Sequence, residues 1–159
     1  MMQRDEKFMR SVELMRSFAG IQKNMIRFVQ KSAVENGLSI PQYTILMTLA
    51  MSREMTQKKM GETTFLPKST LSQAVDGLVR EGLIDRQQVE GNRREMLLSL
   101  SGKGLERIKA IHMQEGGIHQ VFQEVTESLS AGQYDQLLEA HRQINAQLAN
   151  TQQEERQKC

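Results

Sequence analysis

The sequence of 159 residues contains one cysteine, Cys159, only two prolines and no tryptophan. A single cysteine excludes an intramolecular disulfide framework and a cysteine-based zinc cluster. Because Cys159 ends a polar tail with no evident activating neighbours, we interpret it as an incidental thiol and not as a redox sensor. The scarcity of proline, together with eleven methionines, is typical of a mainly helical chain.

Long apolar runs are also missing. The longest run, Ile45–Met51, is interrupted by Thr48, whereas a membrane-spanning helix needs about 20 apolar residues. Met1–Lys7 is polar and lacks the apolar core of a secretion signal. We therefore expect a soluble, cytoplasmic protein with no membrane partner.

The modest net charge of +2 conceals an uneven distribution along the chain. Residues 1–52 and residues 53–110 each carry a net charge of +3, whereas residues 111–159 carry 3 basic and 7 acidic residues. The net positive charge of residues 1–110 is compatible with a face that binds nucleic acid.

The two ends of the chain show the apolar spacing of long helices. Phe8, Val12, Met15 and Phe18 recur at helical intervals and predict one helix over residues 5–33. Toward the other end, serine N-caps are predicted at Ser101 and Ser130, and Gln133 completes a capping box with Ser130. We expect Gly116-Gly117 to bend or break the intervening helix and residues 150–159 to form a frayed tail.

The middle of the chain, residues 39–101, changes to shorter elements. Ser39 is predicted to cap a second helix, Thr56 to open a third and residues 67–81 to form a fourth. Residues 84–100 alternate in polarity around a turn at Gly91-Asn92, which predicts a two-stranded hairpin. This order predicts a mainly α fold, a winged helix-turn-helix with a small β-hairpin wing.

The long end helices carry more apolar surface than this small middle region can cover. A second copy of the same chain is the expected partner.

Residues Thr56–Arg86, followed by Gly91–Gly104, resemble the MarR/SlyA family of bacterial transcription regulators. The resemblance consists of a helix-turn-helix, a Gly-Leu-Ile-x-Arg segment, a wing with two adjacent arginines and a Leu-Ser-x-x-Gly segment. It implies a single MarR-like domain over residues 1–159, and a homodimer held by dimerisation helices at residues 5–35 and 102–149. It also implies that a small amphipathic ligand releases the DNA in many members.

The fourth predicted helix has the pattern of a DNA-recognition helix. One side is apolar and the other presents short polar side chains, as major-groove reading requires. Gln73 stands where family members often carry arginine, and glutamine pairs bidentately with adenine, so we expect a half-site that tolerates A·T pairs. The candidate DNA-binding residues of the whole chain are Lys68, Ser69, Thr70, Ser72, Gln73, Arg86, Arg93 and Arg94.

The predicted wing tip, residues 91–94, carries adjacent arginines that suit a narrow minor groove. Family members usually have an aspartate at the position of Asn92, and this acid orients the arginine that corresponds to Arg94. Asn92 can still form a hydrogen bond with Arg94, but without charge assistance. We assign Arg93 to the phosphate backbone.

Other basic residues leave alternatives open. Arg86 either contacts phosphate or pairs with Asp76 or Asp85. Lys58 and Lys59 precede the recognition helix and are candidates for phosphate contacts.

No catalytic motif, metal cluster or cofactor site stands out, and His112 and His119 are interpreted as scattered histidines. We therefore predict a dimeric regulator, not an enzyme, that binds an inverted repeat in double-stranded DNA and represses until a small amphipathic ligand releases it. Candidate ligand-binding residues are Met15, Phe18, Tyr43 and Met47. The alternative is a winged-helix module that binds protein and not DNA.

Overall fold

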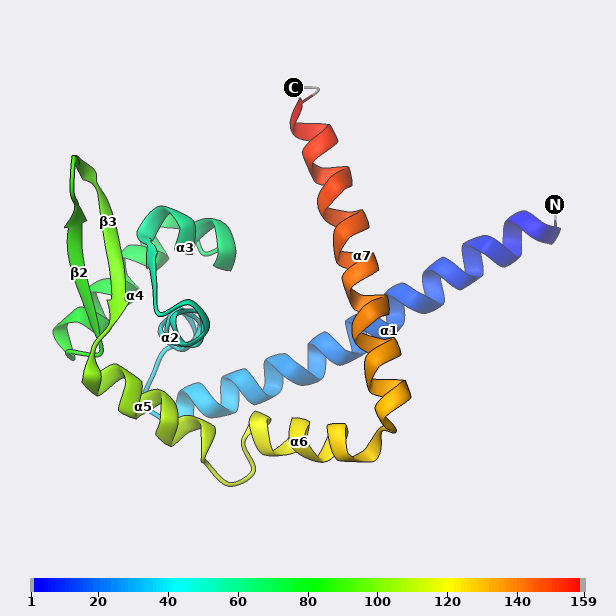
Figure 1. Ribbon diagram of the computed structural model, residues 1–159, viewed down its shortest axis with the longest axis horizontal. Helices are drawn as coiled ribbons and strands as arrows, with labels where there is room; N and C mark the ends of the chain where they lie inside the picture. The colour runs from blue at the N-terminus through cyan, green and yellow to red at the C-terminus, as the bar shows by residue number, and fades with distance from the viewer. Residues whose placement is uncertain (1, 158–159) are drawn as a thin grey trace. The chain divides into compact units, whose positions relative to one another are not determined.

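The computed structural model describes residues 2–157, and the side chains of residues 4–153. Its contacts divide the chain into two compact units, Met1–Ile118 and His119–Cys159, which we describe separately. The fold is mainly helical, with one small antiparallel sheet (Figure 1). The elements in chain order are α1 (Met2–Glu35), α2 (Ile40–Ser52), β1 (Glu54–Thr56), α3 (Gln57–Thr64), α4 (Lys68–Arg80), β2 (Ile84–Val89), β3 (Asn92–Leu100), α5 (Gly102–His112), α6 (Ile118–Ser128) and α7 (Ala131–Gln157).

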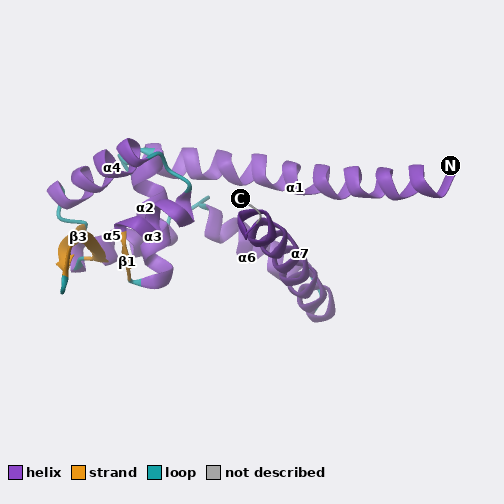
Figure 2. Ribbon diagram, turned by 90° about the horizontal axis from the view of Figure 1, so that it is seen from above, coloured by secondary structure: helices purple, strands orange, loops and turns teal. Residues whose placement is uncertain are grey.

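The first helix, α1, is longer than predicted and leaves the rest of its unit as a single rod (Figures 1 and 2). It ends where the sequence predicts, at Gly37, whose φ of 66° is easily adopted by glycine. The amides of Gly37 and Leu38 donate to the carbonyls of Val34 and Ala33, which is the Schellman pattern. Only the last turns of α1 are buried.

Elements α2 to α5 and the sheet, residues 40–112, form what we call the winged lobe. Its core is built around α2, which contributes Ile45, Leu46 and Leu49, all fully buried. The short helix α3 adds Met60, which is fully buried. The N-caps predicted at Ser39, Thr56 and Ser101 are all present, so local sequence signals position the helices of this lobe.

The sheet differs from the predicted hairpin in two ways. It has three strands in the order β1-β3-β2, because Glu54–Thr56 pairs with β3. This strand is too short to show an alternating pattern in the sequence. The turn of the hairpin lies at Glu90-Gly91, one residue earlier than predicted, because Gly91 supplies a φ of 79° and Asn92 already belongs to β3. Figure 2 shows the strands together on one side of the lobe.

The second unit consists of most of α6 and all of α7. The predicted capping box is present, since the Gln133 amide donates to Ser130 Oγ and the Ser130 amide donates to Gln133 Oε1. The helix α7 continues to Gln157, whereas the sequence predicts a frayed tail from residue 150. The glutamine, glutamate and arginine of this segment are good helix formers. None of the described helices has the length and apolar character needed to cross a membrane.

Candidate nucleic-acid interface

The helix α4 buries one side and exposes the other, as expected of a recognition helix. Its buried residues are Leu71, Ala74, Val75 and Leu78. On the opposite side Lys68, Ser69 and Gln73 are exposed, and Thr70 and Ser72 are half-buried. The predicted contact residues of this helix therefore share one accessible side, which begins at its N-terminus.

The preceding helix, α3, brings two lysines to the same region. Thr56 Oγ1 accepts the amide of Lys59 at 3.1 Å and so caps the start of α3. Lys58 and Lys59 are exposed in this first turn. The ammonium of Lys59 lies 4.0 Å from Glu62, whereas Lys58 has no ion pair among the described residues. Lys58 is the more available of the two for an anionic partner.

The wing carries its arginines in an irregular part of β3. The register with β2 shifts between Gln88, which faces Met96, and Val89, which faces Asn92. Arg93 and Arg94 lie in the extra length that this shift creates, and both are exposed. The shift therefore takes them out of the regular ladder, where a side chain can be re-aimed.

Asn92 orders the chain around the second arginine. Its Oδ1 accepts the backbone amide of Arg94 at 3.1 Å, and its Nδ2 donates to Glu95 Oε2 at 3.4 Å. The predicted hydrogen bond between Asn92 and Arg94 is thus formed with the backbone amide of Arg94 and not with its guanidinium group. This leaves the charged end of Arg94 free for another partner.

A cleft of about 710 Å³ lies between α3, the start of α4 and the wing. Lys58, Lys68 and Arg94 line it, one from each of these three elements. None of the three has an ion pair among the side chains that the structure describes. Two acids, Glu62 and Glu95, and the apolar residues Leu66, Leu71 and Met96 complete most of the lining. The cleft concentrates unpaired positive charge beside the exposed side of α4.

Among the predicted DNA-contact residues, Arg86 is the one that forms an ion pair within the described part of the chain. Its Nη1 lies 2.6 Å from Asp76 Oδ1, so of the two candidate acids Asp76 is the partner. The pair links the middle of α4 to β2. Nearby, Lys103 Nζ donates to the Glu81 carbonyl at 2.8 Å and Ser101 Oγ donates to the Gly82 carbonyl at 2.6 Å, which holds α5 to the end of α4.

The four candidate ligand-binding residues do not line this cleft. Met15 and Phe18 lie on α1 and are 70% and 37% exposed. Tyr43 is buried in the core of the winged lobe, and Met47 packs against that core. The ligand site that they were expected to form stays a prediction.

His112 and His119 do not lie on one continuous helix. A break at residues 113–117 separates His112, at the end of α5, from His119 in α6. Within the described residues no group of three His, Cys, Asp or Glu side chains is placed to hold a metal ion. Cys159 lies outside the described residues.

Sequence reasoning missed Glu95 as a residue of the cleft. Its approach to Asn92 depends on the register shift in the wing, and no sequence pattern signals that shift.

Comparison with known proteins finds a family model that matches part of the chain. Residues 36–95 match the model of the MarR family. The chain is 36% identical over 67 residues to the organic hydroperoxide resistance transcriptional regulator of Bacillus subtilis (strain 168), a match that covers 42% of this chain and 46% of the relative. It is 27% identical over 101 residues to the HTH-type transcriptional repressor YetL of the same organism, covering 62% of this chain and 60% of the relative. The chain thus spans about half the length of these relatives, which are regulators and not enzymes.

A solved structure shows the same fold over most of the chain. The structure of reduced AbfR bound to DNA matches with a TM-score of 0.63 and 19% identity, and covers 92% of this chain and 96% of that chain. At this identity the match establishes the winged-helix fold with its flanking helices.

Proposed function

We propose that this chain, whose residues 36–95 match the model of the MarR family, is a dimeric, sequence-specific DNA-binding transcriptional regulator. The observation that carries the proposal is the cleft between α3, α4 and the wing. Three elements each direct an unpaired cation to it, beside the exposed polar side of α4.

The arrangement suits a duplex whose major groove receives α4 and whose adjacent minor groove receives the wing. Lys68, Ser69 and Gln73 are the exposed residues at the start of α4, where base edges are read. Arg93 and Arg94 leave the regular ladder of the wing and suit a narrow minor groove. The anionic sugar-phosphate strand that separates the two grooves would follow the cleft, where Lys58 and Lys68 face it.

A second copy of the chain completes the proposed binding unit. The exposed apolar residues of α1, among them Phe8 and Met15, are the surface that this second copy would cover. Two-fold symmetry then predicts an inverted repeat with half-sites about one helical turn apart, roughly 10 bp.

Repression follows from occupancy of promoter DNA by this dimer, and the relative YetL is named a repressor. A small amphipathic ligand near Met15, Phe18, Tyr43 and Met47 would release the DNA by binding better to an arrangement that does not fit it. Such a ligand shifts the population only by its difference in affinity for the two arrangements.

The experiment that tests the proposal is a selection from random duplex DNA with the wild-type protein and the Arg94→Ala variant in parallel. We expect the wild type to enrich an inverted repeat that tolerates A·T pairs at the positions facing Gln73. Arg94→Ala should enrich it far less, while remaining a dimer by light scattering. Arg142→Ala is the matched control, because Arg142 is exposed on α7 and pairs with Glu139.

Two outcomes would contradict the proposal. One is the absence of enrichment by wild-type protein shown by mass spectrometry to carry no small molecule, which would favour a protein-binding module. The other is an invariant guanine facing Gln73, which would contradict the assigned reading of that residue.

A further inference from the structure

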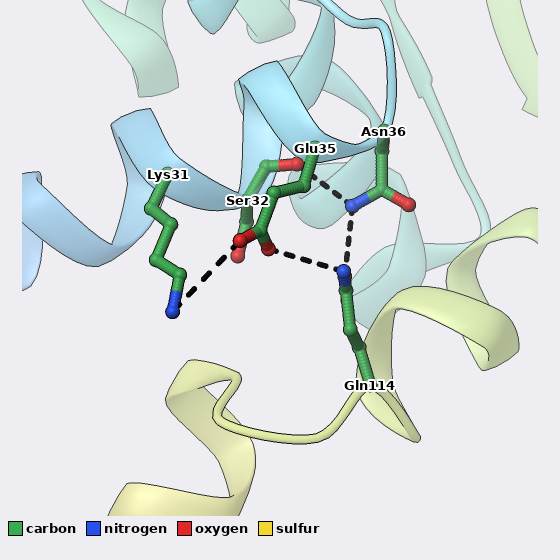
Figure 3. Close-up of polar contacts among 5 residues, drawn as sticks. All are labelled: Lys31, Ser32, Glu35, Asn36 and Gln114. Carbon is green, nitrogen blue, oxygen red and sulfur yellow. Dashed lines mark hydrogen bonds and ion pairs between the residues drawn. The ribbon is translucent and has the colours of Figure 1, made fainter.

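A polar cluster joins the end of α1 to the segment that follows α5 (Figure 3). The side-chain amide of Gln114 uses both of its ends there. Its Nε2 donates to Glu35 Oε2 at 3.1 Å, and its Oε1 accepts from Asn36 Nδ2 at 3.0 Å. We call these three residues, Glu35, Asn36 and Gln114, the α1 clamp.

Further bonds hold the clamp residues in place. Asn36 Nδ2 also donates to the Ser32 carbonyl at 2.7 Å, and the Asn36 carbonyl accepts from Arg107 Nη1 at 3.0 Å. The ammonium of Lys31 lies 3.8 Å from Glu35. The clamp therefore ties the last turn of α1 to α5 and to the chain just beyond it, residues that are far apart in the sequence.

The rest of α1 makes little contact with the winged lobe. Its buried residues are Ser32 and Ala33, in the last turn, and the side chains from Arg4 to Arg27 are almost all exposed. Within the unit Met1–Ile118, the described contacts therefore hold this long rod at its C-terminal end (Figures 1 and 2). The angle at which α1 leaves the winged lobe depends on the contacts at that end. The clamp supplies the polar contacts among them.

The length of α1 amplifies any rotation at the clamp. At a rise of 1.5 Å per residue, the span from Arg4 to Lys31 is about 40 Å. A tilt of about 10° at the clamp would move the far end by roughly 7 Å, or about two base-pair steps of 3.4 Å. A small rotation at the clamp therefore displaces the far end of α1 by a distance comparable to a change of about two base pairs in half-site spacing.

We propose that Gln114 is a positioning residue that fixes the angle between α1 and the winged lobe, and thereby the half-site spacing that the dimer accepts. This inference rests on the proposed function, because α1 sets the separation of two winged lobes only if it carries the dimer contact. Gln114 acts through Glu35 and Asn36 and does not itself touch DNA.

The variant Gln114→Leu tests the amide, because leucine is of similar size and has no hydrogen-bonding group. Glu35→Gln is the conservative variant, since its carbonyl oxygen still accepts the Gln114 Nε2 proton. Glu106→Ala is the control on α5, where Glu106 pairs only with Lys109 in the described structure, at 3.1 Å.

The first measurement is binding to duplexes that carry the selected half-sites at separations increased or decreased one base pair at a time. We expect the wild type, Glu35→Gln and Glu106→Ala to show a sharp optimum. Gln114→Leu should lose roughly tenfold in affinity at that optimum, on the scale expected for two hydrogen bonds, and should discriminate less among the neighbouring spacings. Binding of all four proteins to a duplex with a single half-site should be equal, because the reading surface is unchanged.

The second measurement needs no DNA. Spin labels at Gln22→Cys in α1 and Gln87→Cys in β2, both exposed positions, are introduced with Cys159→Ser. Labelled chains are diluted into an excess of unlabelled protein, so that the distance measured by electron paramagnetic resonance lies within one chain. The distance distribution should be narrow for the wild type and clearly broader for Gln114→Leu.

The outcomes separate this inference from the proposed function. Equal distance distributions and equal spacing profiles for the wild type and Gln114→Leu overturn the role of Gln114. A broadened distribution in a protein that binds no DNA supports the clamp and overturns the proposed function instead, and with it the consequence for spacing.

Discussion

Two arginines of the proposed DNA surface differ because of a single neighbouring acid. Arg86 is neutralised by Asp76 at 2.6 Å, whereas Arg94 has no acid partner in the part of the chain that the structure describes. The sequence leaves Asp76 and Asp85 as equal candidates for Arg86. The geometry of β2 disfavours Asp85 as the partner, because Asp85 and Arg86 are neighbours in this strand and successive side chains of a strand point to opposite faces.

The difference predicts unequal effects of removing the two side chains. Arg94→Ala should reduce the slope of log affinity against log salt concentration by about one, because one unpaired cation near DNA is lost. Arg86→Ala should change that slope much less, because its charge is already balanced by Asp76. Fluorescence anisotropy with the selected operator, over about 50 to 200 mM salt, measures both slopes. Equal slopes for the two variants would show that the pair opens when DNA binds.

At the scale of elements, the features predicted correctly from the sequence are those whose cause is local. The caps at Ser39, Thr56, Ser101 and Ser130 join a side chain to an amide three residues later, so the sequence alone displays them. The strand β1 and the register shift in the wing depend on pairing with residues elsewhere in the chain, and no local pattern signals them.

The close approach of α5 to the end of α4 is another feature that the sequence does not display. Gly104 lies in the first turn of α5, and a Cβ atom there would collide with the backbone carbonyl of Leu83. Backbone cannot swing aside as a flexible side chain does. Gly104 therefore permits the contact that, with Ser101, seats α5 against the winged lobe.

This contact predicts that Gly104→Ala destabilises the fold. The added methyl group should lower the free energy of unfolding by about 1 to 3 kcal/mol, the range found for overpacking. Gly102→Ala is the matched control, since a Cβ atom at Gly102 meets nothing within 4 Å. Its effect should stay within about 0.5 kcal/mol. Urea unfolding followed by circular dichroism measures both, and equal midpoints would contradict the packing argument.

At the scale of the whole molecule, the exposed apolar side chains are concentrated on the long helices. The winged lobe has its own complete core, whereas Phe8 and Met15 of α1 are 65% and 70% exposed. In α7, apolar and aromatic residues recur at alternating spacings of three and four, the pattern of helices that pack against other helices. These residues are Tyr134, Leu137, His141, Ile144 and Leu148. A chain that functions alone rarely exposes so much apolar surface, which favours the second copy.

The proposed dimer predicts that a charge on the apolar side of α1 separates the two chains. Met15→Glu should leave the single chain folded, because Met15 is 70% exposed and the residue contributes no buried contact there. In a symmetric interface the carboxylate enters twice, and an unpaired buried charge costs several kcal/mol, so dimer affinity should fall by roughly a hundredfold or more. Ser17→Glu is the matched control, with the same change in charge on the polar side of α1. Sedimentation equilibrium measures the dissociation constants, and a Met15→Glu protein as dimeric as Ser17→Glu would show that this side of α1 does not form the interface.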